Sequence, residues 1–187
     1  MEYNEIEIIK KCQAGNLDDF TLLYDAYVKK IYNFIYYRTQ HKETAEDLTS
    51  RAFMKALEKI SSFENEKGSF SSWLYRIARN SVIDYYRTKK HDADISDIWD
   101  LASEEKIERD LDTKEKLKKV DEYLKNLKSE QREIIIMRVW QELSYKEIAE
   151  IIGKSEASCK MTYARALAKL KQEMPLSVLF LFILTRL

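Results

Sequence analysis

The chain has 187 residues, of which 45% are hydrophobic and 34% are charged, a composition typical of a globular protein with one or two small domains. Its 32 basic residues balance 32 acidic ones, so function has to be inferred from individual segments and not from the formal net charge of zero. Cys12 and Cys159 lie far apart and outside any CxxC or Cys/His cluster, which argues against a disulfide framework, a zinc site or another metal site. Met1 is followed by acidic residues and not by the basic and apolar regions of a secretory signal, so we expect a cytoplasmic protein.

Turn-forming residues are scarce, because only three glycines and one proline occur in the chain. Long stretches show hydrophobic residues at helical spacing, and no stretch alternates convincingly as a strand. The sequence therefore predicts an all-α fold in which an acidic linker joins two small helical domains. We place these parts at residues 1–90, 91–116 and 117–174, followed by an apolar tail at 175–187.

The first domain is expected to begin with an amphipathic helix after Gly15, with Asn16 as a plausible cap. Its buried stripe comprises Phe20, Leu23, Tyr24, Tyr27, Ile31 and Phe34. A second helix should run from about Glu43 to Ile60 and bury Leu48, Ala52, Ala56 and Leu57. The outward side of this second helix should carry Asp47, Ser50, Arg51, Met54 and Lys55.

A polar loop from Ser61 to Ser69 separates this helix from the next one. It carries hydrogen-bonding groups with no evident structural task, which are Ser61, Ser62, Glu64, Asn65, Lys67 and Ser69. The alternative is that this loop is a simple connector. A third helix is predicted from Ser71 to about Lys90, with Trp73, Leu74, Ile77, Ala78 and Ser81 inward. Its outward residues should be Arg76, Arg79, Asn80, Asp84, Arg87, Lys89 and Lys90.

Aromatic residues interleave with the basic residues of the third helix, an arrangement that would allow stacking on exposed nucleobases. They are Trp73, Tyr75, Tyr85 and Tyr86. For Trp73, packing in the core is the favoured interpretation because the residue lies on the apolar stripe. For Tyr85 and Tyr86, both interpretations stay open.

The stretch from Glu142 to Lys160 predicts a helix-turn-helix. Ser144, followed three residues later by Glu147, forms a capping box that starts the first helix. Gly153 supplies the left-handed residue that ends this helix, and Ser155 caps the second one. The buried side of the first helix should comprise Ile148, Ala149 and Ile152.

The second helix of this motif is the candidate for reading DNA. Its inward positions are Cys159, Tyr163, Ala166, Leu167 and Leu170. With Ser155 at its start, its outward face comprises Glu156, Ser158, Lys160, Met161, Thr162 and Arg165. Five basic and two acidic residues occur between Gly153 and Glu173, a balance that suits contact with phosphates. The alternative is an αα-hairpin with a solvated charged face.

The order of these parts resembles an extracytoplasmic-function (ECF) sigma factor of the sigma-70 family, over residues of about 15 to 173. Ala45–Thr49 with Phe53, and Phe70–Asn80 with Asp84 and Arg87, are similar to the family's second conserved region. Leu143–Ala149 through Lys160 is similar to its fourth region. The resemblance implies a subunit that binds core RNA polymerase, recognises two elements of promoter DNA and helps to open the DNA.

The resemblance also assigns roles to individual residues. It implies that Asp47, Leu48, Ser50 and Arg51 belong to the helix that docks on polymerase, with Ser50-Arg51 standing where the family often has Gln-Glu. It implies that the loop, with Ser61, Asn65 and Ser69, captures a single-stranded base of the −10 element. It also implies that the adjacent DNA strand and its phosphates are contacted by Arg76, Arg79, Asn80 and Arg87. It implies that the outward face of the second helix of the helix-turn-helix reads the −35 element, with Lys160-Met161-Thr162 where the family commonly has Lys-Ser-Arg. A further implied partner is an anti-sigma factor, often membrane-bound.

Between the domains, nine acidic and two basic residues occur from His91 to Asp112, which indicates a solvated linker that repels DNA. Ile95, Ile98, Trp99 and Leu101 offer apolar anchors within it. The tail after Pro175 has a run of nine residues that is apolar except for Ser177, too short to span a bilayer, since a spanning helix needs about 20 apolar residues. We expect this tail either to pack against the second domain or to be offered to a partner or membrane surface.

Two other classes of function fit the sequence less well. A helix-turn-helix regulator with an N-terminal sensing domain would have the same DNA-reading helix, but the first domain shows no phosphoacceptor pocket or glycine-rich phosphate loop. An enzyme is not supported, because His41 and His91 lie in polar segments without a recognisable nucleophile or metal constellation, so no catalytic residue, cofactor or small-molecule substrate is expected.

Overall fold

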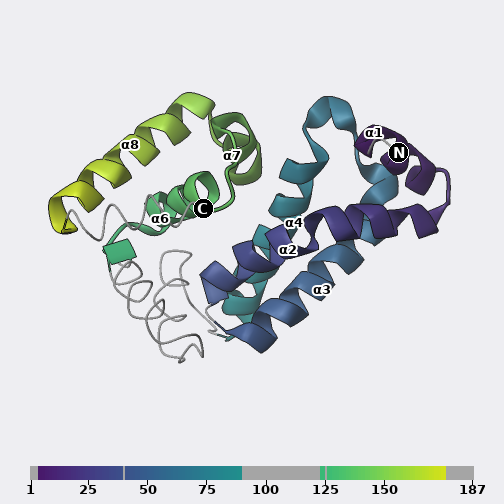
Figure 1. Cartoon of the computed structure of the whole chain (residues 1–187), viewed down its shortest axis with the longest axis horizontal. Helices are drawn as coiled ribbons and strands as arrows, with labels where there is room; N and C mark the ends of the chain where they lie inside the picture. The colour runs from purple at the N-terminus through teal and green to yellow at the C-terminus, as the bar shows by residue number, and fades with distance from the viewer. Residues whose placement is uncertain (1–3, 40, 90–122, 125, 176–187) are drawn as a thin grey trace. The chain divides into compact units, whose positions relative to one another are not determined.

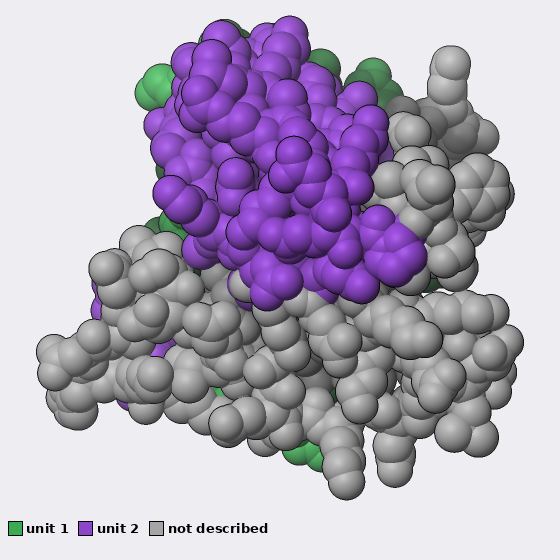
Figure 2. Space-filling model, turned by 90° about the vertical axis from the view of Figure 1, so that its left-hand side faces the viewer, with its two compact units in different colours: residues 1–85 green, residues 86–187 purple. Residues whose placement is uncertain are grey.

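The computed structural model describes residues 4–39, 41–89, 123–124 and 126–175 (Figure 1). All regular structure in these residues is helical, which confirms the predicted all-α class. The chain divides into two compact units, residues 1–85 and 86–187, which Figure 2 distinguishes by colour. Among the described helices, none combines the length and the apolar character needed to cross a membrane. The predicted linker at 91–116 and the tail from Leu176 onward lie outside the described residues.

Four α-helices and three short 3-10 helices form the first unit, although the last four residues of the fourth α-helix lie past its boundary at residue 85. They are α1 (Glu5–Gln13), η1 (Leu17–Asp19), α2 (Phe20–Thr39), α3 (Lys42–Lys59), η2 (Ile60–Ser62), η3 (Asn65–Lys67) and α4 (Phe70–Lys89). Helix α1 was not anticipated from the sequence. Asn4 caps it by accepting a hydrogen bond from the Glu7 N–H at 3.3 Å, and Ile8, Ile9 and Cys12 are buried on its inner side.

The start of α2 differs from the expectation in two respects. Asn16 does not cap a helix, because its amide nitrogen donates to the Asp19 carboxylate at 2.9 Å and a 3-10 turn comes before Phe20. Tyr24 is 41% exposed and not buried, although the edge of its ring contacts Phe53 at a centroid distance of 4.8 Å. The predicted stripe is otherwise correct, with Phe20, Leu23, Ile31 and Phe34 buried and Tyr27 half-buried.

Helices α3 and α4 match their predicted bounds to within one residue. Leu48, Ala52 and Ala56 are buried as expected, whereas Leu57 is only half-buried. In α4 the buried residues are Phe70, Ser72, Leu74, Tyr75, Ala78, Ser81, Val82, Ile83 and Tyr86, while Trp73 and Ile77 are half-buried. The buried face of α4 is therefore broader than the sequence predicted.

The second unit contains α6 (Ser129–Val139), α7 (Tyr145–Ile152) and α8 (Glu156–Glu173). One core cluster of this unit comprises Leu124, Leu127, Ile135, Val139, Ala166, Leu170 and Met174. Arg132 is 6% exposed and donates from Nε to the Leu124 carbonyl at 2.8 Å, which satisfies a buried guanidinium and fixes the segment before α6. Helix α8 ends before the exposed Pro175, as predicted.

One buried position in α7 was wrongly predicted. Ile148 and Ala149 are buried, but the next buried residue is Ile151, which is 2% exposed, while Ile152 is half-buried. Positions 148 and 151 both face the core, because residues three apart lie on nearly the same side of a helix, and Leu143, which precedes the helix, is buried as well. Ile152 lies at the edge of this side.

Candidate nucleic-acid and polymerase interface

The outer side of α3 forms the first candidate surface, which we call the α3 docking face: Asp47, Ser50 and Arg51. All three residues are exposed, as predicted. Arg51 lies one turn after Asp47 and pairs with it through two contacts, Nε to Oδ1 at 3.1 Å and Nη2 to Oδ2 at 3.0 Å. Leu48 is 2% exposed, so it supports this face from inside the core and does not lie on it.

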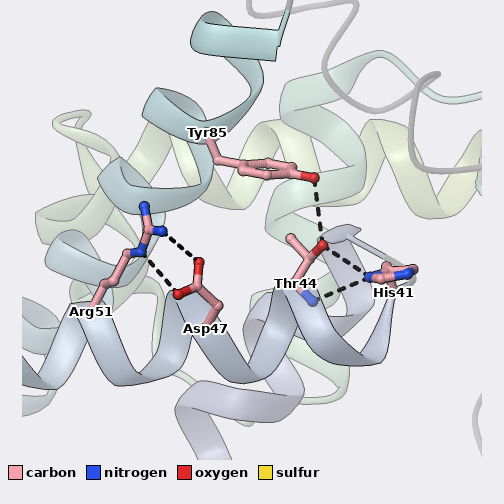
Figure 3. A network of polar contacts seen from close by, with 5 residues as sticks. All are labelled: His41, Thr44, Asp47, Arg51 and Tyr85. Atoms are coloured by element: carbon pink, nitrogen blue, oxygen red, sulfur yellow. Dashed lines mark hydrogen bonds and ion pairs between the residues drawn. The ribbon is translucent and has the colours of Figure 1, made fainter.

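Contacts at the start of α3 tie it to α4 (Figure 3). His41 caps α3, since its Nδ1 accepts the Thr44 N–H at 3.2 Å. The Thr44 hydroxyl lies 3.4 Å from the hydroxyl of Tyr85, which reaches over from α4. Asp84, which directly precedes Tyr85 in α4, forms an ion pair at 4.0 Å with Lys55, farther along α3. These polar contacts link α4 to the helix that carries the α3 docking face.

The 61–69 loop is more structured than the sequence suggested. The prediction that its polar groups lack a structural task is wrong for several of them, because Ser62 donates to the Lys59 carbonyl at 2.8 Å and Lys67 pairs with Glu64 at 2.8 Å. Ser69 caps α4 by accepting the Ser72 N–H at 3.1 Å. Ser61 and Asn65 are exposed, and their side chains form no hydrogen bond or ion pair with the part of the chain that the structure describes.

The second candidate surface, the α4 basic face, consists of Arg76, Arg79, Asn80 and Arg87. At 100° per residue these four positions fall within an arc of about 100° on the helix. Arg76, Asn80 and Arg87 are exposed and Arg79 is half-buried. The nearby acidic residue of α4, Asp84, is engaged by Lys55, so the positive charge of this face is not neutralised by it.

The aromatic residues of α4 are divided between core and surface. Tyr75 and Tyr86 are 1% and 3% exposed, so neither is available to stack on nucleobases, and for Tyr86 the open question is decided in favour of packing in the core. Trp73 is half-buried and packs on Phe63 at 5.4 Å and on Phe70 at 5.6 Å, in agreement with the favoured core interpretation. Tyr85 is half-buried and lies in the polar network of Figure 3.

The helix-turn-helix has the predicted local geometry. The Ser144 hydroxyl accepts the Glu147 N–H at 3.2 Å, and the Glu147 carboxylate accepts the Ser144 N–H at 2.8 Å. Gly153 has a φ of 73° and donates to the Ala149 carbonyl at 2.9 Å. Ser155 then caps α8 by accepting the Ser158 N–H at 3.2 Å. Short-range signals therefore fix both the turn and the two helix starts.

The third candidate surface is the α8 reading face: Ser155, Glu156, Ser158, Lys160, Met161, Thr162 and Arg165. Most of these residues are exposed, and Met161 is 53% exposed, whereas Ser158 and Thr162 are half-buried at the border of the face. The opposite side of α8 is fixed by Cys159, which is fully buried, and by the contact of the Tyr163 and Tyr145 rings at 5.8 Å. The predicted face is thus held on a packed helix.

Lys160 is partly engaged within its own helix. Its Nζ lies 2.7 Å from the Glu156 carboxylate and 5.8 Å from the centre of the Tyr145 ring. An exposed pair one turn apart contributes only about 0.3–0.5 kcal/mol, so a phosphate or base edge can readily replace Glu156 as the partner. Arg165 is exposed and forms no ion pair with the described residues.

The thiols show no features of a reactive or metal-binding site. Burial raises the pKa of Cys12 and also of Cys159, which favours the protonated and unreactive thiol. Both are free cysteines, and the described residues contain no group of His, Cys, Asp and Glu side chains suited to hold a metal ion.

The α3 docking face, the α4 basic face and the α8 reading face together offer charged and hydrogen-bonding side chains for contacts with ligands.

Comparison with known families and proteins adds independent information. Residues 23–91 match the family model described as Sigma-70 region 2, and residues 117–170 match that described as Sigma-70, region 4. The chain is 37% identical over 161 residues to RNA polymerase sigma factor YlaC of Bacillus subtilis, covering 84% of this chain and 92% of that protein. It is 34% identical over 174 residues to ECF RNA polymerase sigma factor BldN of Streptomyces coelicolor, covering 91% of this chain and 66% of that protein.

Solved structures show the same kind of fold. The sigma factor RpoE from Bartonella quintana, in complex with the anti-sigma factor NepR, is 26% identical with a TM-score of 0.65 and covers 82% of this chain and 95% of its own. CnrH, in complex with the cytosolic domain of CnrY, is 20% identical with a TM-score of 0.68 and covers 88% of this chain and 93% of its own. The latter similarity concerns the fold alone.

Proposed function

The chain belongs to the ECF sigma factors of the sigma-70 family, and we propose that it binds core RNA polymerase, recognises the −35 and −10 promoter elements and promotes DNA opening. The observation that carries this proposal is the presence of a basic face beside a polar loop in one unit and a helix-turn-helix in the other. A regulator with an N-terminal sensing domain would not need the first of these, so that alternative is not favoured.

We assign the steps of initiation to the parts of the chain. Residues 1–90 dock on core polymerase and recognise the −10 element, and residues 117–174 recognise the −35 element. Residues 91–116 connect them as an acidic linker, and residues 175–187 form an apolar tail. The family matches at 23–91 and 117–170 support this division.

The −35 element is read as duplex DNA by the α8 reading face. A helix inserted into the major groove reads base edges through donors, acceptors and apolar contacts. Lys160 and Arg165 supply donors to base edges or phosphates, and Met161 supplies an exposed apolar contact suited to a thymine methyl group. Ser155, Ser158 and Thr162 supply hydroxyls along the border, and Glu156 can accept from a cytosine amino group.

The −10 element is bound as a single strand in the first unit. The exposed side chains of Ser61 and Asn65 can hydrogen-bond an unstacked base, and Ser69 fixes the end of the loop as the cap of α4. The α4 basic face follows the adjacent phosphates, since guanidinium groups pair with phosphate oxygens. The α3 docking face (Asp47, Ser50 and Arg51) binds polymerase, and the buried Leu48 contributes only by packing beneath it.

Regulation by an anti-sigma factor, soluble or membrane-bound, is part of the proposal. The solved RpoE structure is a complex with such a factor, and masking of the polymerase-binding face would keep the chain inactive until the factor is released. The chain would act in the cytoplasm, where its polymerase and promoter are found, and would contribute binding and DNA opening with no catalytic step of its own.

The test is transcription in vitro with core polymerase on a library of genomic fragments. We expect transcripts that start downstream of two shared sequence elements, together with copurification of the chain with core polymerase. A folded chain that neither associates with core polymerase nor yields promoter-dependent transcripts would contradict the proposal. A DNA-binding regulator would bind duplex fragments but fail both parts of the test.

A further inference from the structure

The last residue of α1 makes a long-range contact with the end of the α3–η2 segment. The side-chain nitrogen of Gln13 donates to the carbonyl of Ile60 at 3.1 Å and to the carbonyl of Phe63 at 2.8 Å. Helix ends leave carbonyl groups without a partner inside the helix, and such groups need a donor from elsewhere. The Ile60 carbonyl already accepts the Phe63 N–H at 3.1 Å, so Gln13 adds a second donor there. At the Phe63 carbonyl, Gln13 acts as a side-chain cap for a residue that lies 50 positions later in the chain.

The two acceptors lie at the entrance of the 61–69 loop. Phe63 is 6% exposed, and its ring packs on Phe70 at 5.6 Å, so the side chain and the carbonyl of this residue are both fixed. At the other end of the loop, Ser69 caps α4. Within it, the Gly68 N–H donates to the Asn65 carbonyl at 3.3 Å, and the φ of Gly68 is 145°. The loop backbone is held at both ends and at its turn.

Helix α1 is itself anchored, so the backbone of Gln13 is held in place although the residue is exposed. Ile8, Ile9 and Cys12 are buried, and Glu5 at the other end of α1 accepts a hydrogen bond from the Tyr27 hydroxyl of α2. The family match begins at residue 23, so this brace comes from outside the matched region.

We propose that Gln13 is a positioning residue for promoter recognition: it fixes the entrance of the 61–69 loop so that Ser61 and Asn65 are held ready for a single-stranded base. The inference rests on the proposed function, because that function supplies the base. A loop already ordered in its bound conformation loses less conformational entropy on binding, which increases affinity and the ability to distinguish bases. Gln13 itself does not touch the DNA.

The donor chemistry of Gln13 can be separated from its shape. Gln13→Glu keeps the size of the side chain but replaces the donor with a carboxylate that faces two carbonyl oxygens. Gln13→Lys restores a donor of similar reach and serves as the rescue variant. Gln172→Glu in α8 is the matched control, because Gln172 is exposed and hydrogen-bonds to no part of the chain that the structure describes.

The first measurement is amide hydrogen exchange in the full chain without DNA. In Gln13→Glu we expect the amides of Lys67 and Gly68 to exchange about five-fold faster or more, with unchanged protection in α2 and α3. Gln13→Lys and Gln172→Glu should match the natural chain. Equal protection of the loop in Gln13→Glu, or an equal loss of protection over the whole first unit, would overturn the positioning role.

The second measurement is transcription by the holoenzyme on promoters that carry each base at each −10 position. Gln13→Glu should reduce the preference at one position by about 5–10-fold, while affinity for core polymerase and the −35 preference stay unchanged. An unchanged −10 preference would overturn the inference. If the natural chain gives no promoter-dependent transcripts, the proposed function fails, and the exchange experiment still decides whether Gln13 fixes the loop.

Discussion

The turn of the helix-turn-helix depends on the left-handed backbone of Gly153, and substitution there has a calculable effect. A Cβ at this position would meet no atom within 4 Å, so Gly153→Ala introduces backbone strain without a steric clash. The left-handed conformation costs a residue with a Cβ about 1–2 kcal/mol, and the less flexible unfolded chain offsets about 0.4–1 kcal/mol of this. We therefore expect a net destabilisation of about 1 kcal/mol, confined to the second unit.

Asparagine tolerates the left-handed region better than alanine, so Gly153→Asn should cost less than Gly153→Ala. The assay is urea denaturation of the full chain, combined with hydrogen exchange of the Lys154 amide, which bonds to the Ala149 carbonyl at 3.1 Å. Gly15→Ala is a control in the first unit, because Gly15 has a φ of 99° and equally open surroundings. It should cause a similar kind of backbone strain but leave the exchange of the Lys154 amide unchanged. Equal stability of Gly153→Ala and the natural chain, or equal losses for alanine and asparagine, would refute the backbone argument.

Four further predictions concern the surfaces and a buried thiol. Lys160→Ala and Arg165→Ala should each weaken binding of −35 duplex DNA by roughly 1–3 kcal/mol if the side chain reads a base. If the side chain contacts a phosphate, the variant should instead reduce the slope of log affinity against log salt concentration by about 1. Titrations at several salt concentrations distinguish these results, and unchanged binding removes the residue from the interface. Asp47→Lys should lower the affinity for core polymerase but change stability by no more than about 0.5 kcal/mol, because the side chain is exposed; equal binding and transcription would place the docking surface elsewhere. Asn80→Ala should impair DNA opening, measured by permanganate reactivity of thymines near the start site, and an unchanged open complex would argue against its role. Burial raises the pKa of Cys159 above its ordinary value of 9.0, so the contribution of its thiol to stability is complete below pH 9 and declines at higher pH, as the thiol of the unfolded chain ionises. The melting temperatures of the natural chain and of Cys159→Ala should therefore converge as the pH rises above 9. A constant difference between the two melting temperatures would count against this.

Local signals made the helix-turn-helix predictable in detail. The capping box at Ser144, the left-handed Gly153 and the cap at Ser155 each depend on atoms no more than four residues apart, and all three occur in the structure. Helix α1 carries a similar signal, since Asn4 comes three residues before Glu7 and buried apolar residues follow it at helical spacing. The sequence could have revealed this helix, although the prediction did not include it.

Predictions based on periodicity failed at the edges of the buried stripes. Tyr75 and Tyr86 lie 11 residues apart, close to three helical turns, and both belong to the inner side of α4. Their basic neighbours suggested a surface role, but burial of a large aromatic ring outweighed that pattern. The contact of Gln13 with Phe63 spans 50 residues and depends on how α1 docks, so no local pattern could have indicated it. The roles of the site residues in binding polymerase and promoter stay predictions.

The contacts of α1 bear on how this chain can be divided for engineering. A fragment or chimera that begins where the family match begins, at residue 23, would lack Gln13, the buried Cys12 and the buried Phe20. The carbonyl of Phe63 would then lose the donor that Gln13 provides. In a chimera, the N-terminal segment of the relative would be joined to the 61–69 loop of this chain, which it does not fit, and we expect the −10 specificity to suffer. Exchange of promoter specificity between relatives should therefore use a junction before Asn4, where the cap of α1 is retained.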